Sequence, residues 1–164
     1  MTICDDTRLA VLLTLKMIKA GATGEIADFP VSMHPVMYLA KVCGLLKQKV
    51  SNINNFMSSG EYFFKRPATP KTPDDAMTFF NIYDEKLNAL EVFSPEKIHE
   101  VFNAACEESK CEPRVAGKML RTYICGNSVG PPIHDIMALL GKEECFERLP
   151  VPVALYTIKS KSQQ

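Results

Sequence analysis

Apolar residues recur at the spacing of an α-helix, about 3.6 residues per turn, along almost the whole of this chain. In the segment 98–105 (IHEVFNAA), for example, they stand at positions i, i+3, i+4 and i+7, which is one face of a helix. Strand-like alternation appears only at 151–158, where Pro152 favours an edge strand or a loose tail. No internal repeat is present. The spacing therefore predicts an all-α fold.

Capping residues set the boundaries of these helices. Ser94 precedes Pro95, and Thr72 precedes Pro73, so that each time a capping hydroxyl stands before a proline suited to the first helical position. Glycine commonly ends a helix. The predicted helices run from Leu9 to Gly21, from Met33 to about Met57, from Pro73 onward, from Pro95 onward, from Val115 to Ile124 with a stop at Gly126, from Pro131 to Gly141, and from Lys142 to Leu149.

A proline-rich segment divides the chain. Three prolines lie within 65–73 (KRPATPKTP), which is typical of a linker. Just before it, Ser58-Ser59-Gly60 is expected to break or kink the long helix. We therefore expect a first helical subdomain at 1–66, a second at 67–149, and a C-terminal tail at 150–164.

Hydrophobic runs and cysteines indicate a cytoplasmic protein. No run approaches the roughly 20 apolar residues that a transmembrane helix needs, and the richest stretch, 9–18, lacks the features of a secretory signal. The six cysteines are scattered without a CxxC pair, which favours buried, reduced side chains. Cys106 and Cys111 with His99 make a poor zinc site, so we predict no metal ligand.

The net charge of zero conceals a separation of charge along the chain. Residues 31–72 carry +5 and residues 113–164 carry +3, whereas residues 73–112 between them carry −7. If the two basic segments meet in space, they form a patch that could hold a polyanion. A solvated surface of mixed sign is the equally weighted alternative.

No catalytic motif is convincing. The three histidines are far apart, and neither a GxSxG, an HExxH nor a phosphate-binding glycine loop occurs. A small enzyme that uses a scattered set of Cys and His remains a remote alternative.

Four short segments near the C-terminus carry a resemblance to a known family. They are 120–126 (LRTYICG), 130–132 (GPP), 138–143 (ALLGKE) and 148–149 (RL). In this order and spacing they are similar to the C-terminal signature of bacterial-type glutamyl-tRNA synthetases. Earlier in the chain, 45–56 (LLKQKVSNINNF) and 61–64 (EYFF) look like another helix of that family. The resemblance covers about Thr7 to Leu149.

The resemblance implies a fold and a site. The fold would be two small helical bundles packed into an α-helix cage, with an anticodon-binding site between them. Arg121, Gly130, Pro131 and Ile133 match the positions that line the anticodon pocket in the family. Their chemistry is suitable, since bases of a single-stranded loop are read by stacking and hydrogen bonds, and an arginine offers a planar fork of donors. Without the resemblance, Arg121 would be read as an ordinary surface arginine.

Two lysines complete the predicted site. Lys49 stands where many family members have an arginine that reads the third anticodon base, and Lys47 nearby is a possible substitute. A lysine is a point charge and cannot present the same bidentate geometry. Asn55 also replaces a glutamate of the family pattern.

The expected function is binding of the anticodon loop of glutamate tRNA, so that a glutamate–tRNA ligase charges the right tRNA. The HIGH motif and Rossmann domain of the catalytic part do not occur in this sequence, so the chain alone is not expected to be an enzyme. We expect no cofactor here, because ATP and Mg²⁺ would belong to that catalytic domain. The expected partners are tRNA and the rest of a synthetase, with no membrane, and the chain is expected to be a monomer. The alternative is a helical protein–protein interaction module that kept the fold and lost tRNA.

Overall fold

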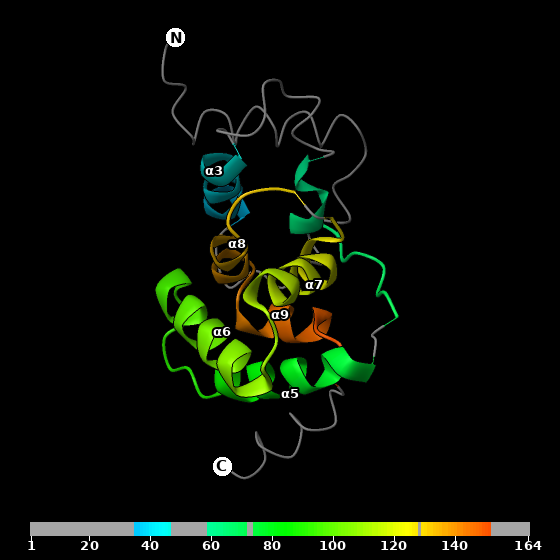
Figure 1. Cartoon of the computed structure of the whole chain (residues 1–164). Helices are drawn as coiled ribbons and strands as arrows, with labels where there is room; N and C mark the ends of the chain where they lie inside the picture. The colour runs from blue at the N-terminus through cyan, green and yellow to red at the C-terminus, as the bar shows by residue number, and fades with distance from the viewer. Residues whose placement is uncertain (1–34, 47–58, 72–73, 128, 152–164) are drawn as a thin grey trace, which may run out of the picture.

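The structure is a computed structural model that describes residues 35–46, 59–71, 74–127 and 129–151 (Figure 1). Within these ranges the chain is helical and contains no strand, which confirms the all-α class. None of the helices described is long and apolar enough to cross a membrane. The elements are α3 (Pro35–Leu46), the 3₁₀ helix η1 (Glu61–Phe63), α5 (Asp74–Asn88), α6 (Pro95–Ser109), α7 (Pro113–Cys125), α8 (Ile133–Leu140) and α9 (Lys142–Arg148).

Helix α6 begins and ends at residues suited to those places. Ser94 has extended backbone angles, and its hydroxyl accepts a hydrogen bond from the backbone N–H of Lys97 at 3.4 Å, while Pro95 occupies the first turn. At the other end Lys110 adopts the left-handed conformation, with φ 55°. The predicted start of this helix is confirmed.

Glycines end the next two helices, as predicted. Gly126 closes α7 with φ 69°, and its N–H donates to the carbonyl of Thr122 at 3.0 Å. Gly141, with φ 89°, separates α8 from α9. Helix α7 starts at Pro113, two residues before the predicted Val115, because proline at the first helical position loses no hydrogen bond.

Aromatic side chains join α5 to α6. The rings of Phe79 and Tyr83 stack with centroids 5.4 Å apart. Phe102 of α6 meets both rings edge-on, at 5.8 Å and 5.9 Å. These edge-to-face pairs add to the burial of large apolar surfaces. The two helices therefore form one packed unit, and α6 then packs against α8.

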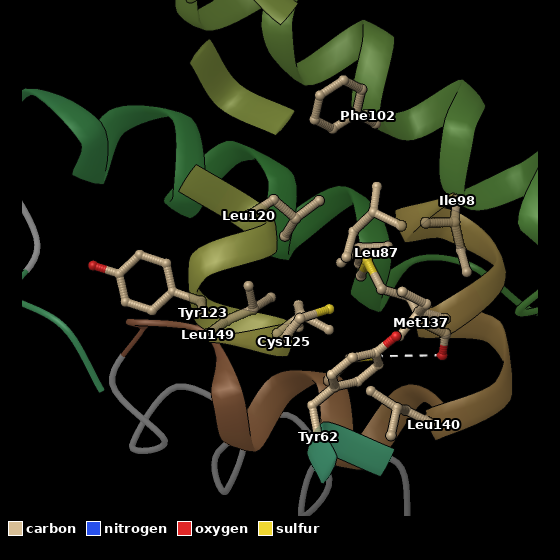
Figure 2. Close-up of a cluster of buried hydrophobic side chains, with 14 of the residues drawn as sticks. Tyr62, Leu87, Ile98, Phe102, Leu120, Tyr123, Cys125, Met137, Leu140 and Leu149 are labelled. Atoms are coloured by element: carbon tan, nitrogen blue, oxygen red, sulfur yellow. Dashed lines mark hydrogen bonds between the residues drawn. The ribbon is translucent and has the colours of Figure 1, made fainter. Parts of the chain in front are cut away.

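Helix α8 lies at the centre of the described structure (Figure 1). It contacts α3, α6, α7 and α9, and its Ile136 and Met137 are fully buried. The hydroxyl of Tyr83 donates to the sulfur of Met137 at 3.6 Å. Side chains from η1, α5, α6, α7 and α8 meet in the hydrophobic cluster drawn in Figure 2, so one core serves all of these elements.

The chain enters η1 through a close contact with α3. Ser59 and Gly60 are helical and lead directly into the 3₁₀ turn. A Cβ atom at Gly60 would stand 2.6 Å from Cδ1 of the buried Leu46, so that only glycine fits without movement of that side chain. The Tyr38 hydroxyl donates to the carbonyl of Phe63 at 2.9 Å and joins the same two elements.

Part of the predicted organisation can be compared with the structure. Residues 65–71 are irregular, as expected of the linker. The division between residues 66 and 67 and the two-bundle cage stay predictions. One hydrophobic cluster contains residues from both sides of that division, from Tyr38 to Val151. The predicted helix from Leu9 to Gly21, residues 47–58, and the alternating segment 152–158 lie outside the described residues.

Candidate functional site

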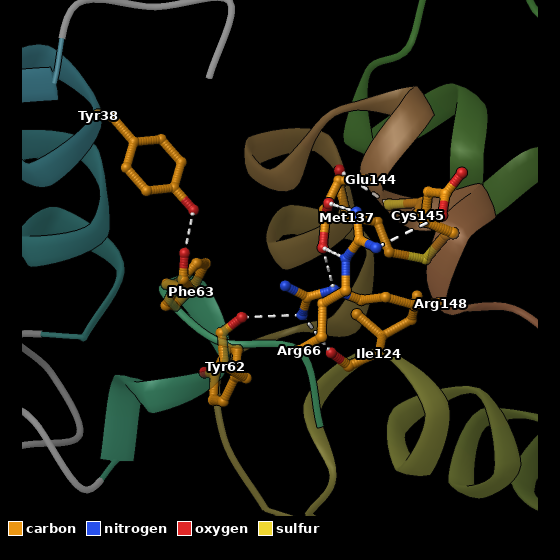
Figure 3. A network of polar contacts seen from close by, with 10 residues as sticks. Tyr38, Tyr62, Phe63, Arg66, Ile124, Met137, Glu144, Cys145 and Arg148 are labelled. Atoms are coloured by element: carbon orange, nitrogen blue, oxygen red, sulfur yellow. Dashed lines mark hydrogen bonds and ion pairs between the residues drawn. The ribbon is translucent and has the colours of Figure 1, made fainter. Parts of the chain in front are cut away.

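An ionic network, buried at Glu144 and Arg148 and half-exposed at Arg66, anchors the segment after η1 to the C-terminal helices (Figure 3). The carboxylate of Glu144 accepts a hydrogen bond from Nε of Arg148 at 2.8 Å. It also accepts hydrogen bonds from Nε and Nη2 of Arg66, at 2.9 Å each. Nη1 of Arg148 donates to the carbonyls of Tyr62 at 2.8 Å and Ile124 at 2.6 Å. Arg148 and Glu144 are both buried, and together they connect η1, the end of α7 and α9.

The network keeps Glu144 ionised. Burial alone would raise the pKa of this carboxyl, but the hydrogen bonds from Arg66 and Arg148, together with their charges, hold it below its ordinary value. The hydrogen bond to Glu144 likewise raises the pKa of the Arg66 guanidinium. Glu144 thus pairs with two guanidinium groups, of which that of Arg148 is buried and that of Arg66 is half-exposed.

Part of the basic charge is therefore paired within the protein. The two basic segments do meet, since the residues after η1 lie against α7 and α9, but Glu144 stands between Arg66 and Arg148 where they meet. Lys142 is engaged too: its ammonium donates to the carbonyls of Asn88 at 2.7 Å and Leu90 at 2.9 Å, at the end of α5. The predicted basic patch is correspondingly smaller than the sequence count suggests.

An exposed basic edge remains on α7. Arg114, Lys118 and Arg121 stand at i, i+4 and i+7, on one face of the helix. Arg114 and Lys118 are exposed, whereas Arg121 is half-buried. The segment 65–71, which carries the exposed Lys65 and Lys71, reaches the end of α7, where Pro67 adjoins Gly126. The four exposed cations, Arg114, Lys118, Lys65 and Lys71, are able to contact a polyanion.

The loop between α7 and α8 is held by Arg121. Nη2 of Arg121 donates to the carbonyl of Pro131 at 2.6 Å. A Cβ atom at Gly130 would stand 3.1 Å from Nη1 of Arg121 and 3.6 Å from the hydroxyl of Tyr62. A side chain at Gly130 would therefore press against Nη1 of Arg121 and lie close to the Tyr62 hydroxyl.

Polar atoms around this loop are buried without a hydrogen-bond partner. Among the described residues they include the Tyr62 hydroxyl, Nη1 of Arg121 and Nε2 of His134. Burial raises the pKa of Tyr62, so the hydroxyl keeps its proton. Burial, with the nearby His99 and Arg121, lowers the pKa of His134 to about 4, so the imidazole is neutral at pH 7. Buried polar groups in native proteins are normally paired, so these three require an explanation.

The structure brings several predicted site residues together. Arg121, Gly130 and Pro131 lie in direct contact at the α7–α8 loop. Ile133 is the first residue of α8, where its buried side chain joins the core just beyond the loop. Lys47 and Lys49 lie outside the described residues.

Sequence reasoning missed Tyr62, Glu144 and Arg148. Tyr62 belongs to the aromatic run 61–64, which suggested only a structural element. Glu144 and Arg148 stand at i and i+4 on one helix face, which was a usable signal, but nothing in the sequence pointed to Arg66 as their third member.

The cysteines of the described residues agree with the sequence reading. Five are free, of which four are buried and Cys111 is half-buried. No group of three or more potential metal ligands gathers in the part of the chain that the structure describes.

Fold and site together define an all-α domain with a basic helix edge and, at the loop between α7 and α8, a group of buried polar atoms. The family model of the anticodon binding domain matches residues 25–151. The chain belongs to this anticodon-binding domain family, and it is homologous to the C-terminal region of glutamate–tRNA ligases.

Curated relatives and solved structures agree with this family. The chain is 29% identical over 151 residues to the glutamate–tRNA ligase of Chromobacterium violaceum, covering 88% of this chain and 31% of that protein. It is 28% identical over 114 residues to glutamate–tRNA ligase 1 of Fervidobacterium nodosum, covering 68% of this chain and 24% of the relative. The chain thus spans about three-tenths or less of the length of these relatives.

A similar fold occurs in the crystal structure of a glutamate tRNA ligase from Elizabethkingia meningosepticum in complex with its amino acid. The TM-score is 0.62 at 22% identity, and the match covers 87% of this chain and 30% of the other. At this identity the likeness supports the fold alone.

Proposed function

We propose that this chain binds tRNA at the α7–α8 loop and contributes anticodon recognition to the aminoacylation of glutamate tRNA. The single observation that carries the proposal is the state of Arg121. One nitrogen of its guanidinium holds the carbonyl of Pro131, and Nη1 is buried without a partner beside Gly130. A positioned donor of this kind is suited to the edge of an unpaired base.

The exposed cations around the loop would hold the RNA backbone. Arg114 and Lys118 precede Arg121 on the same helix face, and Lys65 and Lys71 lie in the segment that reaches the end of α7. Phosphate contacts position a nucleic acid without reading its sequence, whereas base contacts supply specificity. The arrangement divides these two tasks between the helix edge and the loop. Any chemistry of ATP and Mg²⁺ would belong to a catalytic domain.

We expect tRNA binding to depend strongly on salt. With three or four phosphates neutralised by these cations, affinity should fall about 10- to 50-fold between 50 and 200 mM salt. Fluorescence anisotropy of labelled tRNA at several salt concentrations measures the slope. An affinity that does not change with salt would favour the protein–protein interaction module. The hydrogen bonds of Arg66, Arg148 and Lys142 within the protein also favour that module, because they leave fewer cations for RNA.

Arg121→Ala should narrow the preference for glutamate tRNA over tRNAs with other anticodons. Loss of a specific base contact costs about 1–3 kcal/mol, by analogy with bidentate readout of DNA. Arg114→Ala, on the exposed edge of the same helix, is the matched control. It should weaken the binding of all tRNAs by a similar factor. Measured dissociation constants for each tRNA and each variant give the ratios.

A structural control separates folding from recognition. Lys142→Ala removes the two hydrogen bonds at the end of α5, so it should lower thermal stability and leave the ratio between tRNAs unchanged. If Arg121→Ala weakens every tRNA equally, as Arg114→Ala does, then Arg121 is only a phosphate anchor and the assignment of base reading to it is wrong.

A further inference from the structure

Two cysteines lie on either side of the turn that ends α6. The chain leaves the helix through Lys110, whose φ of 55° is left-handed, and the backbone N–H of Cys111 donates to the carbonyl of Cys106 at 3.0 Å. The N–H of Lys110 donates to the carbonyl of Glu107 at 3.3 Å. These hydrogen bonds define a Schellman motif, in which Cys106 and Cys111 hold the two positions whose side chains commonly meet.

The hydrogen bond between the two cysteines limits the distance between their Cα atoms. A carbonyl oxygen lies about 2.4 Å from the Cα of its own residue, and an amide nitrogen about 1.5 Å. With the hydrogen bond at 3.0 Å, the Cα atoms of Cys106 and Cys111 are no more than about 7 Å apart. A disulfide becomes impossible without backbone movement only beyond about 7 Å. The turn therefore places the two cysteines within reach of a bond.

The side chains of the two cysteines share one environment. Both line an open surface hollow of about 460 Å³, together with Asn103 and Pro113. Cys106 belongs to the hydrophobic core, and Cys111 packs against that core. Burial, and after it the nearby thiol of Cys111, raises the pKa of Cys106 to about 11. The two sulfur atoms are therefore neighbours.

The two thiols differ in their access to solvent. Cys111 is half-buried, whereas Cys106 is only 3% exposed. A small molecule reaches Cys111 through the hollow, while Cys106 is too buried for direct attack. Because its pKa is raised, Cys106 also keeps its proton at neutral pH, and a protonated thiol is a poor nucleophile. Cys111 is therefore the thiol that reacts first.

We propose that Cys106 and Cys111 form a reversible disulfide, which fastens the end of α6 to the start of α7. The oxidant is a small disulfide such as glutathione disulfide. The Cys111 thiolate attacks one of its sulfur atoms, forms a mixed disulfide and releases one glutathione thiolate. Cys106 then loses its proton, and its sulfur attacks Sγ of Cys111, which releases the second glutathione. The protein gives up two electrons and two protons, and these convert glutathione disulfide into two molecules of glutathione.

The position of the bond gives it a consequence for stability. Pro113 begins α7 shortly after Cys111, and the exposed Arg114 and Lys118 follow on that helix. A disulfide across the turn removes conformational freedom mainly from the unfolded chain. The oxidised protein should therefore melt about 2–8 °C above the reduced protein. A lower Tm after oxidation would show that the bond strains the turn, and its role as a fastening would be wrong.

The test treats the folded full chain with glutathione disulfide, blocks the remaining thiols by alkylation and maps the product by mass spectrometry. Trypsin cleaves after Lys97, Lys110 and Arg114, so the disulfide joins the peptides 98–110 and 111–114. This linked pair should lack two hydrogen atoms relative to its separate peptides. Dithiothreitol should restore both thiols. The measurement needs no RNA, so its result does not depend on the proposed function.

Two variants assign the roles of the thiols. Cys106→Ala should stop at the mixed disulfide, with one glutathione on Cys111. Cys111→Ser should leave Cys106 unmodified, because that thiol is buried. The inference fails if the wild type ends with glutathione on Cys111 and gives no linked peptides. It fails equally if Cys106 reacts as fast in Cys111→Ser as in the wild type, since Cys111 would then not be the entering thiol.

Discussion

Replacing Arg148 by methionine should lower the free energy of unfolding by about 3–5 kcal/mol, the range measured when one partner of a buried ion pair is removed. The change leaves Glu144 buried beside Arg66 alone and leaves the carbonyls of Tyr62 and Ile124 without their donor. The loss should loosen the attachment of η1 to α7 and α9. Chemical denaturation at pH 7 measures the change.

The control for this prediction is an exposed pair within the same network. Arg66 and Glu147 stand 3.4 Å apart with side chains about half exposed, so Glu147→Gln should cost about 0–1 kcal/mol. If Arg148→Met lowers the free energy of unfolding as little as Glu147→Gln does, the network does not hold the helices together.

The same network gives the stability a dependence on pH. The folded-state pKa of Glu144 is lowered below its ordinary value of 4.5, so its stabilising contribution is present above that value. The contribution is lost as the pH falls through the folded pKa. Between pH 5 and pH 3, the free energy of unfolding of Arg148→Met should therefore fall less than that of the wild type. An equal fall in both proteins would show that the pairing of Glu144 with Arg148 is not the cause of the pH dependence.

Gly126→Ala should destabilise the fold by about 2–5 kcal/mol, the sum of two costs. Alanine at the left-handed φ of 69° costs about 1–2 kcal/mol. The new Cβ would also stand 2.7 Å from Cβ of Pro67, which overpacks the contact between the linker and the end of α7 at a cost of about 1–3 kcal/mol.

Gly141→Ala measures a cost of backbone conformation without a steric clash. Gly141 has φ 89° and ψ 161°, a conformation that residues other than glycine hardly adopt, but a Cβ atom there would meet nothing within 4 Å. Its replacement should therefore cost about 1–3 kcal/mol through the backbone alone. Thermal or urea unfolding of the variant measures the loss, and a variant as stable as the wild type would contradict this expectation.

Local features were predictable from the sequence because they depend on neighbouring residues. The periodic apolar positions of α6, its Ser94 cap, and the stops at Gly126 and Gly141 follow from backbone geometry and hydrogen bonds within a few residues. Arg121, Gly130 and Pro131 were singled out as a group only by the family resemblance, although just ten residues separate Arg121 from its partner carbonyl.

The sequence by itself determined the all-α class, most helix ends and the loop at which a site could form. Only the tertiary structure decided which charges are free, because Arg66 and Glu144 are 78 residues apart in the chain and 2.9 Å apart in space. It also decided that Tyr62 faces Arg121 across Gly130. Burial and long-range pairing depend on how helices pack, and no local pattern records which of two basic side chains will meet a carboxylate and which will meet solvent.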